Sequence, residues 1–203
     1  AIYAGTLLSL QGLMIQMLAH GLSSAALFIM AGQLYERLHT RDLTLMGGMW
    51  GQFRYYAPML MFFSAALLGI PGTGNFIGEF MILFGAFAQY PVFVVLATFS
   101  LVLAGLYSLI LIYRALFGTN NIEAVALHET KSHGLPPRRV KDLGKRELSL
   151  LLMLAAGLVW LGLYPQPFLD TSSHAMQWIN NAYIYSQVTQ VDMSPLLDAM
   201  EAR

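Results

Sequence analysis

Four apolar segments, each long enough to cross a lipid bilayer, constrain the fold of this chain more than any other feature. A transmembrane helix needs about 20 predominantly apolar residues, and such segments lie at residues 8–32, 55–90, 91–116 and 148–165. Only 11% of the 203 residues are charged, whereas an ordinary soluble domain has about 25%. The sequence therefore predicts an all-α membrane protein with about four transmembrane helices.

The second apolar segment, residues 55–90, is too long for one straight crossing. About 35 residues at about 1.5 Å each would give a helix of roughly 52 Å, against a hydrocarbon core of about 30 Å. Three residues that interrupt helices lie near its middle: Pro71, Gly72 and Gly74. Proline has no amide hydrogen to donate within a helix. The sequence therefore predicts a broken helix with halves at about 56–70 and 75–89.

Glu79 is the only acidic residue inside these four segments. A carboxylate inside a bilayer is costly, so such residues usually face an interior path and take part in function. Glu79 follows the predicted break by two helical turns, and broken membrane helices are tolerated where they line a cavity or are covered by protein. Glu79 is therefore the leading candidate for a functional residue.

His20 is a second titratable residue inside an apolar segment. Its neighbours at helical spacing are Gln16, Ser23 and Ser24, so the first segment carries a polar stripe that must face protein or water. Two interpretations stay open. His20 can relay protons, or it can bond to neighbouring helices, and the glutamine and serines can serve as polar contacts between helices.

His20 and Glu79 lie at similar depths, each near the middle of its crossing. Two titratable groups at one depth favour a lateral proton relay, because burial and a neighbouring charge can bring such groups to change protonation near neutral pH. Asn75 lies one turn before Glu79. It could cap the second half-helix or bond the carboxylate, and its type favours the capping role. Tyr107 in the third segment is a further candidate for lining a water path.

Ten of the eleven lysine and arginine residues lie on one predicted side of the membrane. They are Arg37, Arg41, Arg54, Arg114, Lys131, Arg138, Arg139, Lys141, Lys145 and Arg146; the eleventh is Arg203. By the positive-inside rule, the loops that hold them are cytoplasmic and both termini are periplasmic. We interpret these residues as a topology signal, and no nucleic acid partner is expected.

The tail after the fourth segment is expected to form a short amphipathic helix at the membrane interface. Pro165 and Pro167 are expected to stop the preceding helix, and Ser172 or Ser173 to cap the next one. Aromatic residues further along suit the headgroup layer.

Redox and metal chemistry are not expected in this chain. It has no cysteine, which excludes disulfides and cysteine-ligated iron–sulfur or zinc sites. The histidines show none of the common metal-ligand spacings, and the glycines of residues 69–78 lack the lysine of a phosphate-binding loop. We expect no metal and no cofactor bound by these residues.

Four blocks of sequence carry a family resemblance: AHGLSSAALFIMAGQLYERLHTRDL, LGIPGTGNFIGEFMILFG, LYSLILIYRALFG and GLYPQPFLD. They resemble the C-terminal part of the subunit M family of bacterial NADH-quinone oxidoreductase, respiratory complex I. The resemblance covers nearly the whole chain, which is similar to the last four helices of these antiporter-like subunits, including their second broken helix. It implies a proton-translocating subunit of the bacterial inner membrane, with NADH, FMN, iron–sulfur clusters and quinone bound elsewhere in the complex.

By motif match, the resemblance places His20 and Glu79 in the family's central hydrophilic axis. Related antiporter-like subunits carry a lysine where this chain has Glu79, which favours the M type. The family's other key charged groups lie in earlier helices, so the N-terminal remainder of the subunit and neighbouring membrane-arm subunits are expected partners. Residues 1–166 would form the C-terminal part of the translocating domain, and 167–203 a periplasmic tail. The alternatives are a subunit of a multi-subunit sodium/proton antiporter and a non-conducting membrane scaffold.

Overall fold

The described part of the chain is helical throughout its regular elements. The computed structural model describes residues 1–38, 47–117 and 141–201. Its elements are η1 (Ile2–Ala4), α1 (Leu7–Leu38), α2 (Met49–Gln52), α3 (Tyr56–Leu67), α4 (Gly74–Phe87), α5 (Pro91–Phe117), α7 (Lys145–Leu163) and α8 (Gln166–Glu201). The predicted all-α class is confirmed.

Three of these helices, α1, α5 and α7, are long and apolar enough to cross a membrane, and α3 and α4 are shorter apolar helices. Together α3 and α4 cover the oversized second segment, with a turn of six residues, 68–73, between them. The prediction of about four crossings, one of them broken near its middle, is confirmed.

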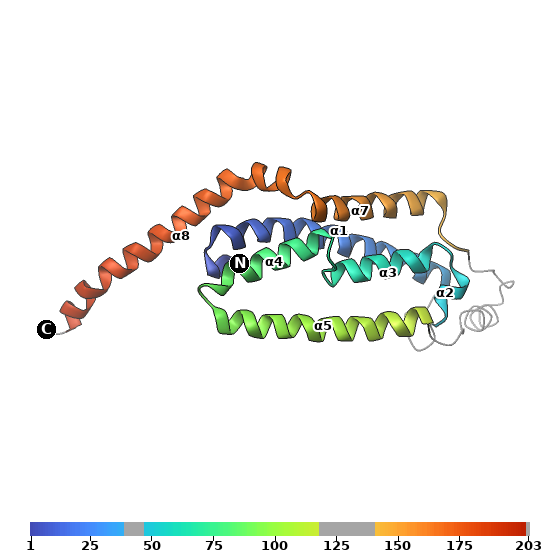
Figure 1. Ribbon diagram of the computed structural model, residues 1–203, viewed down its shortest axis with the longest axis horizontal. Helices are drawn as coiled ribbons and strands as arrows, with labels where there is room; N and C mark the ends of the chain where they lie inside the picture. The colour runs from blue at the N-terminus through green and yellow to red at the C-terminus, as the bar shows by residue number, and fades with distance from the viewer. Residues whose placement is uncertain (39–46, 118–140, 202–203) are drawn as a thin grey trace.

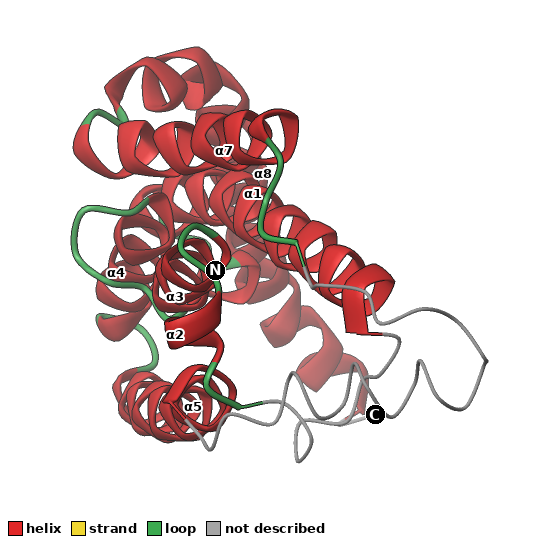
Figure 2. Ribbon diagram, turned by 90° about the vertical axis from the view of Figure 1, so that its right-hand side faces the viewer, coloured by secondary structure: helices red, strands yellow, loops and turns green. Residues whose placement is uncertain are grey.

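Helix α1 lies at the centre of the bundle. Figure 1 shows α7 along one side of α1, while α5 lies on the other side of the α3–α4 pair. The end-on view in Figure 2 shows the same order, and the most extensive packing in the chain is between α1 and α4. The helix that carries the predicted polar stripe, α1, and the helix that carries Glu79, α4, are therefore direct neighbours.

The turn between α3 and α4 depends on two glycines with left-handed backbone conformations. Gly69 has φ 71° and Gly72 has φ 94°, and residues with a Cβ atom rarely adopt such positive values. Within the turn, the Gly69 amide donates to the Ala66 carbonyl at 3.1 Å and the Thr73 hydroxyl donates to the Ile70 carbonyl at 2.8 Å. These local bonds satisfy backbone groups that the break frees.

Glycines allow α4 to approach its neighbours at backbone distance. A Cβ placed on Gly78 would lie 2.8 Å from the Cα of Gln16, and one on Gly74 would lie 2.9 Å from the side chains of both Ala19 and Leu161. Small residues at helix contacts are typical of membrane bundles, where dispersion and polar contacts hold helices together in the absence of a hydrophobic drive.

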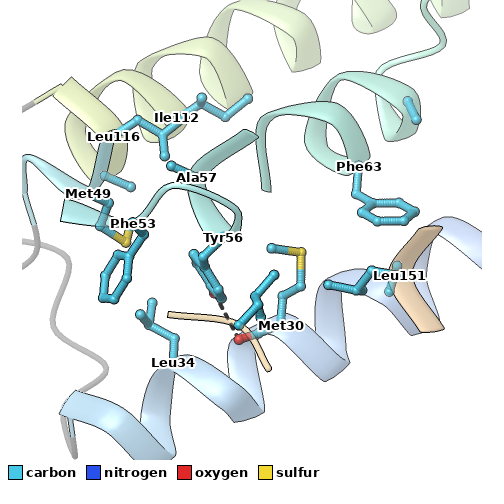
Figure 3. Packing of buried hydrophobic residues seen from close by; sticks show 14 of the residues in the cluster. Met30, Leu34, Met49, Phe53, Tyr56, Ala57, Phe63, Ile112, Leu116 and Leu151 are labelled. Carbon is cyan, nitrogen blue, oxygen red and sulfur yellow. Dashed lines mark hydrogen bonds between the residues drawn. The ribbon is translucent and has the colours of Figure 1, made fainter. Parts of the chain in front are cut away.

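A second packing centre lies at the end of the bundle near α2. Figure 3 shows the Tyr56 ring among buried side chains, with its hydroxyl donating to the Met30 carbonyl of α1 at 2.8 Å. Met49, Phe53 and Leu116 are buried in the same cluster. This bond satisfies the one polar atom of a large buried aromatic side chain.

Polar residues at this end join α1 and the start of α3 to residues 141–147, which lead into α7. Arg37 forms an ion pair with Glu147 at 2.7 Å and donates to the Lys141 carbonyl at 2.8 Å. The Asp142 carboxylate accepts the amide hydrogens of Tyr55 at 2.9 Å and Tyr56 at 3.1 Å. These contacts hold the C-terminal end of α1 and the start of α3 against the start of α7, while the predicted side of the two loops stays a prediction.

Arg37 thus has a structural role that the topology interpretation did not include. Other residues of that interpretation lie outside the described ranges: Arg41, Lys131, Arg138, Arg139 and Arg203. The face of the membrane on which each end lies stays a prediction.

The Asp142 contacts give a stability prediction. Because the carboxylate satisfies the first free amides of α3, we expect Asp142→Ala to destabilise the subunit by about 1 kcal/mol, the usual cost of losing a helix N-cap. Asp170→Ala is the matched control, since Asp170 is exposed and its carboxylate accepts, among the described hydrogen bonds, one from Gln166 of its own helix. The thermal unfolding midpoint of both variants measures the effect, and equal midpoints would contradict it.

The predicted short tail helix is wrong in length and in its start. Helix α8 runs over Gln166–Glu201, so Pro167 lies in its first turn, where proline is tolerated because that amide has no partner within the helix. Ser172 and Ser173 do not cap it, because their hydroxyls donate to the carbonyls of Phe168 and Asp170 inside the helix.

Candidate functional site

Glu79 lies in the second turn of α4, directly beyond the break, and its side chain is half-buried. One carboxylate oxygen, Oε1, accepts a hydrogen bond from Gln16 Nε2 of α1 at 3.3 Å. The other, Oε2, lies against the turn: a Cβ on Gly69 would be 2.6 Å from it. The carboxylate is therefore held between the polar stripe of α1 and the backbone of the break.

Two glycines that the sequence interpretation did not single out shape this site. Gly69 lacks the Cβ that would overlap Glu79 Oε2, and Gly78 lacks one that would lie 2.6 Å from Gln16 Oε1. A glycine just before a proline-containing break, and a glycine next to the only acidic residue of a crossing, are the signals that could have identified them.

Asn75 neither caps α4 nor bonds the carboxylate, so both expectations for it are wrong. Helix α4 begins after Thr73 without a side-chain cap. The fully buried Asn75 instead donates from Nδ2 to the Ala66 carbonyl of α3 at 2.8 Å and to Ser23 Oγ of α1 at 3.2 Å. Asn75 thereby links both halves of the broken helix to α1. It is the second residue of α4, one position past the first residue Gly74, so it does not stand at the N-cap position.

Ser23 is buried and receives this bond, while its hydroxyl donates to the Ala19 carbonyl at 2.9 Å. The Ser24 hydroxyl donates to the His20 carbonyl within its own helix. Of the two serines, Ser23 is the polar contact between helices that the sequence predicted, whereas Ser24 satisfies its own backbone.

His20 lies one turn beyond Gln16 on α1, with an exposed side chain. It lies on the helix that packs most extensively against α4, the helix that carries Glu79. None of the described hydrogen bonds joins the two side chains directly, so the predicted lateral relay needs an intermediate carrier such as water.

Tyr107 does not join this group in the described structure. It lies on α5, its side chain is 66% exposed, and none of the described hydrogen bonds connects it to Glu79 or Gln16. The turn residues Pro71, Gly72 and Gly74 contribute through the backbone of the break.

The arrangement is suited to binding a proton. Within the described ranges, no group of three histidine or acidic side chains could hold a metal ion. The site holds a carboxyl group with one amide partner, an imidazole one turn further along α1, and the break between α3 and α4 beside it. A carboxyl group in such a place can take up and release a proton without further chemistry.

Comparison with known proteins identifies the family. Residues 1–105 match the family described as NADH:quinone oxidoreductase/Mrp antiporter, TM. NADH-quinone oxidoreductase subunit M of Pseudomonas aeruginosa is 51% identical over 185 residues, which are 89% of this chain and 34% of that protein. Subunit M of Escherichia coli (strain K12) is 49% identical over 189 residues, covering 93% of this chain and 35% of that protein.

The fold agrees with these sequence matches. A chain in the solved structure of respiratory complex I from Thermus thermophilus with bound NADH superposes with a TM-score of 0.74. It is 24% identical, and the match covers 88% of this chain and 35% of that one. This chain thus spans about a third of the length of the relatives that it matches. The matched residues and the shared helical fold together place it in the NADH:quinone oxidoreductase/Mrp antiporter transmembrane family.

Proposed function

We propose that this chain is part of a proton-translocating subunit, of the M type, in a bacterial NADH:quinone oxidoreductase. The observation that carries the proposal is the position of Glu79: the only acidic residue within the apolar crossings lies beside a broken helix and is bonded by Gln16. The sequence relatives at about half identity are subunits of that enzyme, which supports the same assignment.

In this proposal Glu79 binds and releases the translocated proton, and His20 passes protons laterally to or from it. Gln16 holds the carboxylate, while Ser23, Asn75 and the break of Pro71, Gly72 and Gly74 fix the geometry of the crossing. Ser24 and Tyr107 have supporting roles at most, because neither contacts the carboxylate in the described structure.

The proposed partners are the lipid bilayer, the remainder of the same subunit, and neighbouring membrane-arm subunits. Electron transfer through NADH, FMN, iron–sulfur clusters and quinone would take place in other parts of the complex. Residues 1–166 would contribute to the translocating domain and residues 167–203 would form its periplasmic tail, now with a long helix in place of a short one.

Two alternatives remain for comparison. The family description also names Mrp antiporters, but the relatives at about half identity are subunit M proteins, which favours the oxidoreductase. A non-conducting scaffold would use the same polar contacts only to hold helices together. Proton flux in vesicles that contain the assembled complex with Glu79→Gln separates transport from a scaffold, because only transport needs the ionisable group.

The proposed topology gives a labelling prediction. We expect a cysteine at Lys141 to react with an impermeant thiol reagent only from the cytoplasmic side, and a cysteine at Asp170 only from the periplasmic side. Lys141 precedes the start of α7 and Asp170 lies in α8, beyond the end of α7, and this chain has no cysteine of its own. Reaction of both cysteines from the same side would reject the topology.

A further inference from the structure

Among the described side chains, only Gln16 forms a hydrogen bond with Glu79. Of the two polar atoms of its amide group, only the nitrogen takes part. The Nε2 donor bonds Glu79 Oε1 at 3.3 Å, whereas Gln16 Oε1 is buried and accepts no hydrogen bond in the described structure. A buried amide oxygen without a donor is uncommon and calls for an explanation.

The chemistry of a carboxyl group supplies one. An ionised carboxylate can only accept hydrogen bonds, so it uses the amide N–H of Gln16 and leaves the amide oxygen unpaired. A protonated carboxyl group has one O–H donor and one carbonyl acceptor. A primary amide offers the matching pair, one acceptor and one donor on adjacent atoms, and the two groups can form two parallel hydrogen bonds.

We propose that Gln16 is a positioning residue that is hydrogen-bonded to Glu79 in both protonation states. It forms one hydrogen bond with the carboxylate and two with the carboxylic acid. On protonation, the new O–H donates to Gln16 Oε1 while Nε2 continues to donate to the other oxygen of Glu79. This inference rests on the proposed function of Glu79 as a proton carrier, and it assigns Gln16 the task of keeping the carboxyl group in place during both halves of the cycle.

The packing holds the Gln16 side chain against α4 and the Glu79 carboxylate against the turn. Gly78 lets the Gln16 side chain lie directly on α4, with Oε1 where a Cβ of Gly78 would be 2.6 Å away, and Gly69 brings the second oxygen of Glu79 against the turn. The titratable side chain one turn further along α1, His20, forms no hydrogen bond with Gln16 or Glu79 within the described ranges.

The test compares Gln16→Met with Gln33→Met in the assembled complex. Methionine keeps the length of glutamine but can neither donate through N–H nor accept strongly. Gln33 is the matched control: it lies on α1 at the other end of the bundle, and its buried Oε1 also has no donor in the described structure.

The first readout is the infrared C=O stretch of the protonated Glu79 carboxyl group, identified as the band that Glu79→Gln removes. We expect Gln16→Met to shift this band to higher frequency, because the carbonyl loses its N–H donor, and Gln33→Met to leave it in place. The second readout is the pH profile of proton pumping. We expect Gln16→Met to change this profile and Gln33→Met to leave it unchanged, because Gln16→Met removes one hydrogen bond from the carboxylate but two from the carboxylic acid.

An unchanged band together with an unchanged pH profile in Gln16→Met would overturn the inference. If Gln16→Met fails to assemble, Gln16→Asn is measured, since it keeps the amide but withdraws it from the carboxyl group and should shift the band in the same direction. If Glu79→Gln pumps normally, the proposed function fails, yet the infrared band still reports whether Gln16 binds Glu79, so the two failures are distinguishable.

Discussion

Glu79→Gln is expected to lower proton pumping by about tenfold or more, and to lower the coupled quinone reductase activity with it, while the complex still assembles. Glutamine keeps the volume of glutamate and can hydrogen-bond at the same place, but it cannot bind and release a proton. The Gln16 contact at 3.3 Å and the packing against Gly69 can therefore persist. Only a role that depends on ionisation is lost.

Related variants give this prediction its internal controls. Glu79→Asp should be milder, because it keeps the ionisable group and only shortens its reach. His20→Ala should give a weaker defect of the same kind, since no direct hydrogen bond to Glu79 is lost and water can partly bridge the gap. Glu36→Gln, the same substitution at an exposed position near the end of α1, should leave pumping unchanged. Wild-type proton flux with Glu79→Gln would show that Glu79 belongs to a scaffold.

The length and pattern of the apolar segments were sufficient to predict the membrane helices. The break at Pro71 was predictable because backbone chemistry forbids a continuous helix there and because the segment exceeds the bilayer. Glu79 could be named as a candidate site residue because the burial of its carboxylate is costly wherever the helix lies, and its role stays a prediction. Both inferences depend on local chemistry and need no knowledge of neighbouring helices.

The partners of the polar residues were not predictable in the same way. Asparagine is a residue type that often caps helices, but the Asn75 side chain bonds Ala66 of α3 and Ser23 of α1, because both helices pack against it. Arg37 was interpreted as part of a charge bias, and its ion pair with Glu147 joins residues that are far apart in the sequence. Helical spacing shows which residues share one face of a helix. Which residues of other helices contact that face depends on tertiary packing.

The start of α8, directly after α7, was also not predictable from the sequence. Pro165 and Pro167 were expected to stop one helix and delay the next, but proline is equally compatible with the first turn of a helix. The sequence leaves this choice open, and in the structure α8 starts at once, with Pro167 as its second residue. The contact between the Tyr183 hydroxyl and the Tyr3 carbonyl at 3.1 Å holds α8 against the start of the chain, a long-range contact that helix propensity does not contain.

Gly78→Ala is expected to destabilise the subunit by about 1 to 3 kcal/mol, the usual cost of overfilling a packed contact. The added Cβ would lie 2.6 Å from Gln16 Oε1 and 2.8 Å from the Gln16 Cα. Rotation of a side chain can relieve the first contact. The second is with the backbone of α1, so α1 and α4 must move apart, and the hydrogen bond to Glu79 lengthens with them.

Gly105→Ala is the matched control, and its expected effect has the opposite sign. No atom lies within 4 Å of a Cβ at Gly105 in the middle of α5, and alanine in a helix interior is favoured over glycine by about 1 kcal/mol. Thermal unfolding of the purified complex and the amount of the subunit in membranes measure both variants, and pumping by the assembled fraction measures the effect on Glu79. Equal stability of the two variants would show that α1 and α4 are not packed at backbone distance, and the site would then lose the contact that holds Gln16 against the carboxylate.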